Sequence, residues 1–375
     1  MRILVLNVGS ATLKAAMFDR GDDGLRELAR VIEELHAGGP LESALARAID
    51  ELGPRTDAVE AVGHRVVHGG RRLQAPTRID GAVEAELERL TSLAPLHQPA
   101  ALEAIRIARR IFPERAQIAV FDTAFHASRS RASLHYALPD AWTQRFDLRR
   151  FGFHGIAHAS LVEGFARQRN ALPREIDGVT LQLGHGCSAC AVLGGRSIET
   201  SMGFTPLEGL MMGTRSGDVD PGVLIHLLRS GIGLDELEAT LQQRSGLTGI
   251  AGTADMRALL AAVERGEERA DLALELFVHR IVLTVGAYLT LLGGPRALVF
   301  GGGIGENAPL VRAKVALGLR AWGMDLDEAA NEAGAPGPIS RPGTTPVHIV
   351  RTNEEAEIAR LVATAVGAWD GSFRA

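Results

Sequence analysis

The sequence is poor in cysteine, has no strong excess of charge and lacks a long apolar run. Only two cysteines occur in 375 residues, which argues against a secreted scaffold held by disulfides. The net charge of −5 indicates neither a nucleic-acid partner nor a membrane surface. The N-terminal apolar run is too short for a signal peptide, and the longest run, around Ile281–Leu292, is shorter than the ~20 residues that span a bilayer. We therefore expect a cytoplasmic protein without membrane or nucleic-acid partners, and the length suggests two or three domains.

The segment Ser201–Gly222, SMGFTPLEGLMMGTRSGDVDPG, has neither a helical nor a strand period. Its apolar residues argue against disorder, and a long ordered segment without a pattern is usually a functional loop. We expect its glycine turns to hold Arg215, whose planar guanidinium suits a carboxylate or a phosphate. The alternative is a surface loop with an exposed arginine.

Two strand–turn–strand segments lie about half a chain apart. In the first, the strands Arg2–Leu6 and Lys14–Asp19 flank the turn NVGSATLK, and in the second, the strands Val179–Leu183 and Cys190–Leu193 flank GHGCSA. This repeat predicts a duplicated domain. Two such turns facing each other across a cleft would hold a polyphosphate from both sides.

The first of these turns has the composition of a phosphate site. Its small residues let an anion approach the backbone N–H groups, Ser10 and Thr12 supply hydroxyls, and Lys14 supplies charge. An ordinary hairpin with a surface lysine is the alternative. In the second turn, Cys187 and Cys190 form a C-x-x-C pattern, but no second cysteine pair accompanies them, and residues three apart in a strand point to opposite faces. We interpret both as small buried thiols.

Three further polar side chains, in three separate motifs, are candidates for the site. The motif GHRVVHGG at residues 63–70 puts Arg65 and Val67 on one face, where they would suit a small carboxylate with a short alkyl tail. Asp122 ends a strand, a frequent place for catalytic groups in α/β folds, although an Asx turn is an alternative. His154, in the motif FGFHG, is by itself more typical of a structural core residue.

The motif GGGIGENAP follows the expected strand Arg296–Phe300. It matches the loose glycine pattern of dinucleotide-binding turns, but a strand-to-helix turn of this kind can equally hold adenosine and its phosphates. We expect Asn307 to cap the next helix, with Pro309 in its first turn, and Asn353 to cap the last helix. Helical periodicity predicts further helices at Leu41–Leu52, Gly81–Leu93, Gln98–Phe112, Pro221–Leu228, Leu234–Gln243, Asp255–Val263 and Asp271–Leu292.

Together these motifs resemble the acetate kinase family over nearly the whole chain. They occur in the family's order: NVGSATLK, GHRVVHGG, APLHQP, AVFDTAFH, RRFGFHG, SMGFTPLEGLMMGTRSGDVDP, FGGGIGEN and TNEE. The resemblance implies an α/β fold with two duplicated ribonuclease-H-like domains around a nucleotide-binding cleft, as in sugar kinases, heat-shock ATPases and actin. It places residues 1–150 and 354–375 in an N-terminal domain and residues 151–353 in a C-terminal domain. It also implies a homodimer.

The resemblance also implies a role for each matching residue. Arg65, Asp122, His154 and Arg215 would be catalytic, and Asn7 and Glu354 would hold Mg²⁺. The acetate would lie against Arg65, Val67, Leu96, His97, Phe153 and Pro206. ATP or ADP would be bound by Ser10, Thr12, Lys14, Gln182, Gly184, His185, Gly186, Asp255, Met256, Arg257, Gly303, Ile304 and Asn307.

The implied reaction is reversible phosphoryl transfer between ATP and acetate, giving acetyl phosphate and ADP. A kinase for propionate or another short carboxylate is a near alternative, because one methylene is worth only ~1–3 kcal/mol of discrimination. The family's second phosphate turn usually reads HLGNG, whereas this chain has Gln182 and His185 at the positions of the His and the Asn. This departure motivates a second alternative, a nucleotide-binding module with weak or no turnover. The third alternative is a dehydrogenase built on the GGGIGEN turn.

Overall fold

The computed structural model describes residues 1–9, 12–21, 24–35, 39–94 and 97–369. The chain forms two compact units. The first unit comprises Met1–Ala127, Gly155–Ser160 and Asn353–Ala375, and the second comprises Ser128–His154 and Leu161–Thr352.

The division of the chain differs from the expected one in the segment 128–154. The sequence placed the first boundary at residue 150, whereas residues 128–154 pack with the second unit. There the buried guanidinium of Arg129 lies 3.2 Å from the carboxylate of Glu199.

Two of the predicted site residues, Ser10 and Leu96, lie outside the described residues.

The first unit is built on a six-stranded sheet of order β3-β2-β1-β4-β6-β5. Neighbouring strands β1, β2 and β3 are antiparallel, β1, β4 and β6 are parallel, and β5 returns antiparallel to β6. The strands are β1 Arg2–Val8, β2 Thr12–Gly21, β3 Gly24–Glu34, β4 Ala61–Val66, β5 Thr77–Arg78 and β6 Ala116–Phe121. Because β4 ends at Val66, Val67 lies beyond the strand on which the sequence placed it with Arg65.

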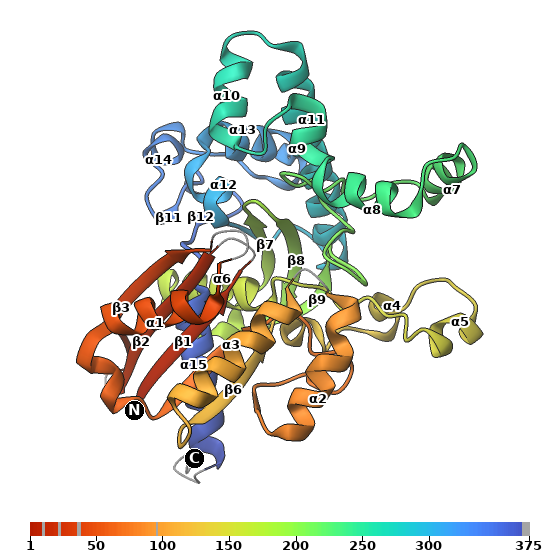
Figure 1. Cartoon of the computed structure of the whole chain (residues 1–375). Coiled ribbons are helices and arrows are strands. Elements are labelled where there is room, and N and C mark those ends of the chain that lie inside the picture. The colour runs from red at the N-terminus through yellow and green to blue at the C-terminus, as the bar shows by residue number, and fades with distance from the viewer. Residues whose placement is uncertain (10–11, 22–23, 36–38, 95–96, 370–375) are drawn as a thin grey trace. The chain divides into compact units, whose positions relative to one another are not determined.

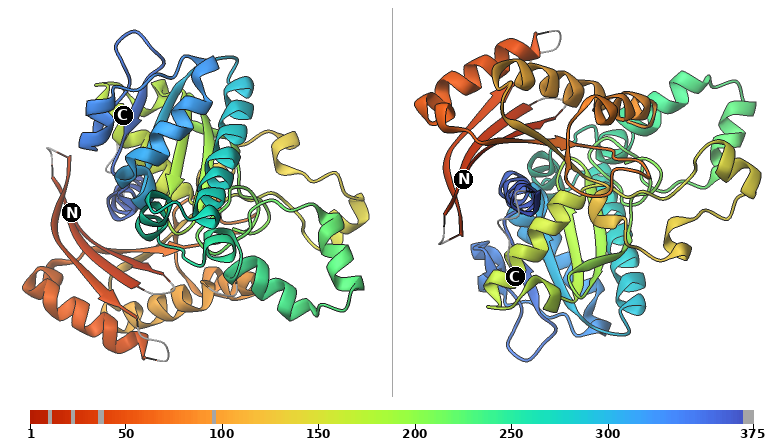
Figure 2. Two further views of the ribbon diagram at one scale, coloured as in Figure 1. Left: turned by 90° about the horizontal axis from the view of Figure 1, so that it is seen from above. Right: turned by 90° about the horizontal axis from the view of Figure 1, so that it is seen from below.

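Helices cover both faces of the first sheet, because its inner strands are buried on both sides. The apolar stripes of α1 (Leu41–Leu52) and α3 (Gln98–Ile111) pack on one face, and α15 (Glu354–Trp369) packs on the other. Figure 1 shows α15, in blue, beside the red strand β1, although they come from opposite ends of the chain. Figure 2 shows the helices in orange along one side of the red strands. The remaining helix wholly within this unit is α2 (Gly81–Arg89), with short 3-10 helices at Gly53–Ala58, Leu90–Leu93 and Ala124–His126.

The second unit repeats the topology of the first. Its sheet has the order β11-β12-β10-β7-β8-β9, with β7, β8 and β9 antiparallel, β7, β10 and β12 parallel, and β11 antiparallel to β12. The strands are β7 Gly178–Leu183, β8 Cys187–Leu193, β9 Arg196–Thr200, β10 Ala297–Gly301, β11 Gly337–Pro338 and β12 Val347–Ile349. The duplication predicted from the two strand–turn–strand segments is therefore confirmed.

Helix α6 (Gly155–Gln168) begins in the first unit and ends in the second. The other helices of the second unit are α4 Arg131–Leu134, α5 Asp140–Arg145, α7 Pro221–Arg229, α8 Leu234–Gln243, α9 Gly246–Ala251, α10 Met256–Glu264, α11 Glu268–Leu291, α12 Gly302–Asn307, α13 Pro309–Gly318 and α14 Glu328–Ala333, with 3-10 helices at Pro173–Glu175 and Arg320–Trp322. Among the described residues, the one helix with the length and composition of a membrane span is α11. It is longer than the apolar run seen in the sequence, but one side, including Phe277, Ile281 and Val285, is buried in the core.

One predicted cap is wrong and another is confirmed. Asn307 does not cap the helix that begins at Pro309. It ends the short helix α12, and its side-chain amide donates to the carbonyl of Gly303 at 2.9 Å. Asn353 does cap α15, because its Oδ1 accepts from the N–H of Ala356 at 3.0 Å.

The two cysteines, Cys187 and Cys190, are buried and free, as the sequence predicted. Burial raises the pKa of each thiol to about 12.

Candidate active site

The first unit gathers three of the predicted site residues around the guanidinium of a fourth, Arg65. Arg65, on β4, donates from Nη2 to Asp122 Oδ2 at 2.7 Å and from Nη1 to Asn7 Oδ1 at 3.2 Å. Asn7, on β1, in turn donates to Glu354 Oε2 at 3.0 Å and to Glu355 Oε1 at 2.8 Å. The cluster forms because the parallel strands β1, β4 and β6 bring these residues to the same edge of the sheet, where α15 begins.

Charges within this cluster oppose the effect of burial. Burial by itself disfavours the guanidinium, but the carboxylates of Asp122 and Glu354 outweigh it and raise the pKa of Arg65. Burial also raises the pKa of Asp122, and the charge of Arg65 opposes that shift. The short bidentate contact holds the planar Arg65 side chain in a single orientation.

The same cluster fits a hydrated magnesium ion. Mg²⁺ in phosphoryl-transfer sites is held by one or two carboxylates, with water and substrate phosphates completing its shell. Glu354 provides a carboxylate that is 14% exposed, and Asn7 holds it by a hydrogen bond. Among the described residues, no group of three or more His, Cys, Asp or Glu side chains forms a complete protein-only metal site. The donor set therefore suits an ion that arrives with a nucleotide.

Lys14 joins the cluster through a residue that the sequence analysis did not assign to the site. Its Nζ lies 3.7 Å from Glu355 Oε1, and Arg30 donates to the other oxygen of that carboxylate at 3.1 Å. Glu355 itself is buried. Its place beside Glu354 in the motif TNEE was the one signal in the sequence that could have pointed to it.

The second unit brings His154 and Arg215 together at the β7–β8 turn. His154 has the left-handed φ of 57°, which is uncommon outside glycine, and its Nδ1 lies 2.9 Å from Ser188 Oγ. A Cβ placed on Gly186 would lie 3.1 Å from His154 Cε1 and 3.6 Å from Arg215 Nη1. A methyl group here would crowd the imidazole, whereas its contact with the guanidinium would be an ordinary one. His154 and Arg215, which come from distant motifs, thus converge over one backbone turn.

Arg215 is a half-buried cation without a described carboxylate partner. Its Nη1 donates to the carbonyl of Pro206 at 3.2 Å and contacts Met212 Sδ at 3.6 Å. Partial burial lowers the pKa of this guanidinium, and the nearby thiol of Cys187, whose own pKa is raised, is neutral near neutral pH. A guanidinium that is withdrawn from water in part normally has an anionic partner, so this geometry favours a site for a bound anion.

A pocket of about 530 Å³ in the second unit contains eight of the predicted nucleotide residues. They come from the β7–β8 turn, from the start of α10 and from α12. Gly302, which begins α12, has a φ of 76°, and a Cβ there would lie 2.5 Å from the carbonyl of Leu183. The lining residues are Gly184, His185, Ala254, Asp255, Met256, Arg257, Leu260, Gly303, Ile304, Asn307 and Ala308.

Gln182 does not line this pocket but connects to its glycine turn. Its Oε1 accepts from Thr352 Oγ1 at 2.9 Å, and Gly302 N donates to the same hydroxyl at 3.0 Å. Glu306 closes the network by accepting from both backbone N–H groups, of Gly302 and of Thr352. Neither Thr352 nor Glu306 was singled out from the sequence, although both lie within recognised motifs.

The remaining predicted residues are divided between the units. Val67 and His97 belong to the first unit, and Phe153 and Pro206 belong to the second.

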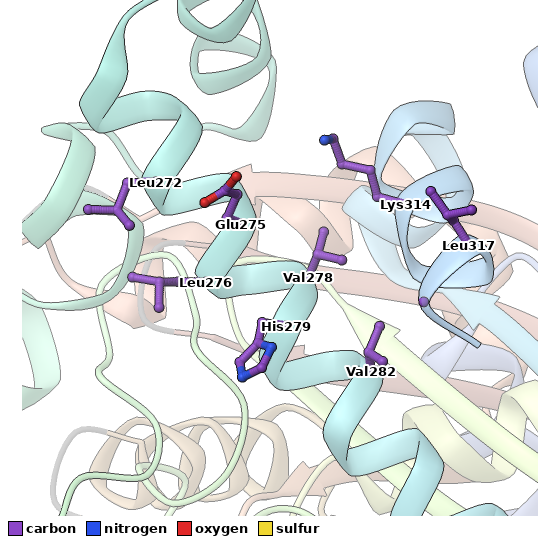
Figure 3. Close-up of a pocket in the computed structure, with 9 residues that line it drawn as sticks. Leu272, Glu275, Leu276, Val278, His279, Val282, Lys314 and Leu317 are labelled. Carbon is purple, nitrogen blue, oxygen red and sulfur yellow. The ribbon is translucent and has the colours of Figure 1, made fainter. Parts of the chain in front are cut away.

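A second pocket of similar volume, shown in Figure 3, lies between α11 and α13 and is lined mainly by leucine and valine. It contains none of the predicted site residues and no converging cations, so we do not assign the chemistry to it.

Comparison with known proteins agrees with this geometry. A model of the acetokinase family matches residues 32–360. The chain is 43% identical to the acetate kinase of Leifsonia xyli, covering 98% of this chain and 99% of that protein, and 42% identical to that of Deinococcus deserti, covering 99% of each. Its structure resembles a propionate kinase from Francisella tularensis (TM-score 0.88, 34% identity, 96% and 98% coverage) and the acetate kinase of Porphyromonas gingivalis (TM-score 0.87, 33% identity, 97% and 99% coverage).

The duplicated sheets and the likeness to solved acetate and propionate kinases define a phosphotransferase with the actin-like fold. More specifically, the chain belongs to the acetokinase family. It is therefore an ATP-dependent enzyme of the class that phosphorylates a carboxyl group.

Proposed function

We propose that this enzyme transfers a phosphoryl group reversibly between ATP and acetate, giving acetyl phosphate and ADP. The observation that carries the proposal is Arg215, a half-buried guanidinium beside His154 for which the structure describes no carboxylate partner. A carboxylate is already a nucleophile near neutral pH, so the reaction needs no strong base. Its main obstacle is repulsion between two anions, which positive charge reduces.

The two clusters would have different tasks. Arg215 and His154 would stabilise charge on the equatorial oxygens of the transferring phosphoryl group. Arg65, which Asp122 holds in one orientation, would position the carboxylate. Gln182 would donate to phosphate through its side-chain amide, while Thr352 holds its oxygen. This would preserve a hydrogen bond at that position but not a positive charge.

Asn7 and Glu354 would hold the Mg²⁺ that accompanies the nucleotide. When bound, this ion neutralises charge on the phosphate oxygens. The glycine turn at Gly302 and the start of α10 would bind the adenosine, and Lys14, Thr12 and Ser10 would contact the phosphates. This assignment makes the dehydrogenase alternative unnecessary, because the same glycine turn serves ATP.

The choice between acetate and propionate needs a direct measurement, since a propionate kinase is among the similar structures. Acyl phosphate formed with each acid is trapped as a hydroxamate, with ATP and Mg²⁺ in excess. We expect a higher kcat/KM for acetate. A preference for propionate would support that alternative, and ATP binding without acyl phosphate from any short acid would support the nucleotide-binding module.

We also propose that the enzyme acts as a cytoplasmic homodimer. Helix α7 has no buried residue, yet Val223, Ile225 and Leu228 are 45%, 51% and 43% exposed. On α5 and just beyond it, Trp142 and Phe146 are also exposed. Figures 1 and 2 show α7–α8 and α4–α5 extending from the same side of the second unit. A second copy of this surface would cover these side chains.

A further inference from the structure

Arg129 is a buried cation that none of the roles above uses. It lies between the 3-10 helix Ala124–His126 and α4, and its side chain is 0% exposed. Burial lowers the pKa of its guanidinium, opposed mainly by the charge of Glu199. A charged side chain this deeply buried is retained only where its hydrogen bonds are well satisfied.

The partners of Arg129 lie on the segment that leads to the active site. Its Nη2 donates to the carbonyls of Arg150 and Phe151, the second at 2.9 Å, and its Nη1 donates to Ser133 Oγ at 3.1 Å and to Glu199 at 3.2 Å. Arg129 therefore joins strand β9, through Glu199, to residues 150–151.

The same short segment is also held from its other side. The N–H groups of Phe151 and Gly152 both donate to the carbonyl of Gly203 at 3.0 Å. Gly203 lies in the long glycine-rich segment that carries Arg215. Residues 150–152 are thus bound through their carbonyls by Arg129 and through their N–H groups by that segment.

This double attachment precedes two residues with left-handed backbone. Gly152 has a φ of 78° and His154 a φ of 57°. For a non-glycine residue this conformation costs ~1–2 kcal/mol and persists only where the surroundings enforce it. Between the two lies Phe153, which is 1% exposed. The direction of both the Phe153 and His154 side chains depends on how residues 150–152 are held.

We propose that Arg129, paired with Glu199, is a positioning residue that sets Phe153 against the acyl group and His154 against the phosphoryl group. The inference rests on the proposed function, because it states that Arg129 affects which acyl group the enzyme prefers. It predicts that disturbing Arg129 changes turnover and the acetate-to-propionate ratio, while the affinity for ATP is kept because no residue that lines the adenosine pocket is a printed partner of Arg129.

The test compares Arg129→Lys and Arg129→Met with wild type by steady-state kinetics. Lysine keeps the charge near Glu199 but cannot donate to two carbonyls in the geometry of a guanidinium. We expect kcat to fall about tenfold or more in both variants, as small misplacements of reacting groups do. We also expect the ratio of kcat/KM for acetate to that for propionate to change about threefold, with KM for ATP within about twofold.

Ser133→Ala is the matched control, since it removes the hydroxyl contact of Arg129 but leaves the carbonyl contacts intact. It should leave the acyl ratio unchanged. If Arg129→Met does not fold, Arg129→Lys alone decides. Wild-type kcat and acyl ratio in Arg129→Lys would overturn the inference, as would a fall in kcat that merely matches a smaller folded fraction measured by ATP-site titration. Absence of acyl phosphate from the wild-type enzyme would instead refute the proposed function.

Discussion

Arg65 and Arg215, which the sequence analysis both named as catalytic, have different surroundings. Arg65 is neutralised by Asp122 at 2.7 Å, whereas Arg215 has only carbonyl and sulfur contacts among the described residues. A guanidinium already paired with a carboxylate mainly orients the group that it contacts, but a half-buried one without a carboxylate attracts an anion. Arg215 should therefore have the larger effect on the chemical step.

We predict that Arg215→Ala lowers kcat by ~10²–10³, the usual effect of removing one donor to a developing charge. ATP affinity, measured by calorimetry, should stay within about threefold, because the adenosine pocket does not include this residue. The exposed Arg244 supplies the control, and Arg244→Ala should be fully active. Near-normal turnover of Arg215→Ala would remove this arginine from the mechanism.

A second prediction at the residue scale concerns His64, which is fully buried on β4. Burial lowers the pKa of its imidazole from 6.5 to about 4. Between these values the unfolded chain binds a proton that the folded chain does not, so stability is lost as the pH falls from about 6.5 towards about 4. From this group alone we expect a loss of ~2 kcal/mol between pH 7 and pH 5.

Thermal melts at several pH values test this expectation. His64→Leu should melt with a weaker dependence on acid than wild type, whatever its stability at neutral pH. His279→Leu is the control, because this imidazole is exposed on α11 and remains in water. An identical slope of Tm against pH in wild type and His64→Leu would contradict the prediction.

At the scale of elements, the β7–β8 turn depends on the absence of one side chain. A Cβ on Gly186 would crowd the imidazole of His154 at 3.1 Å. We predict that Gly186→Ala displaces His154 and lowers kcat about tenfold or more, with little change in Tm. Gly233→Ala is the control, since a Cβ there meets nothing within 4 Å. Unchanged turnover in Gly186→Ala would show that the turn tolerates the methyl group.

The extent of the helices also explains why one cap predicted from the sequence was wrong and another helix start was correct. Asn307 looked like a helix cap because it precedes Pro309, but the glycines before it already form the short helix α12. Asp255 was placed at the start of a helix and does cap α10, accepting from Arg257 N at 2.9 Å. The residue that caps the N-terminus of a helix can be predicted from the sequence only where the preceding segment does not itself fold into a helix.

At the scale of the whole molecule, the exposed apolar side chains of α7 predict self-association. We expect light scattering to give the mass of a dimer for the wild-type protein. Ile225→Glu should shift it towards the monomer, because a charge at this position would be costly to bury in an interface. The exposed Leu172, 48% accessible, lies away from α7 in sequence, and Leu172→Glu serves as the control. A monomeric wild-type protein would refute the proposed dimer.

The sequence by itself determined the duplicated α/β fold and most helices, and it supplied the site residues that we propose. It could do so because apolar periodicity sets secondary structure locally, and because long motifs kept their order along the chain. Only the tertiary structure decided that Arg215 lacks a described carboxylate, that Glu355 joins the Lys14 cluster, and that Arg129 holds the segment before His154. These facts depend on contacts between residues far apart in the chain, and no local pattern specifies which distant group a charged side chain will meet.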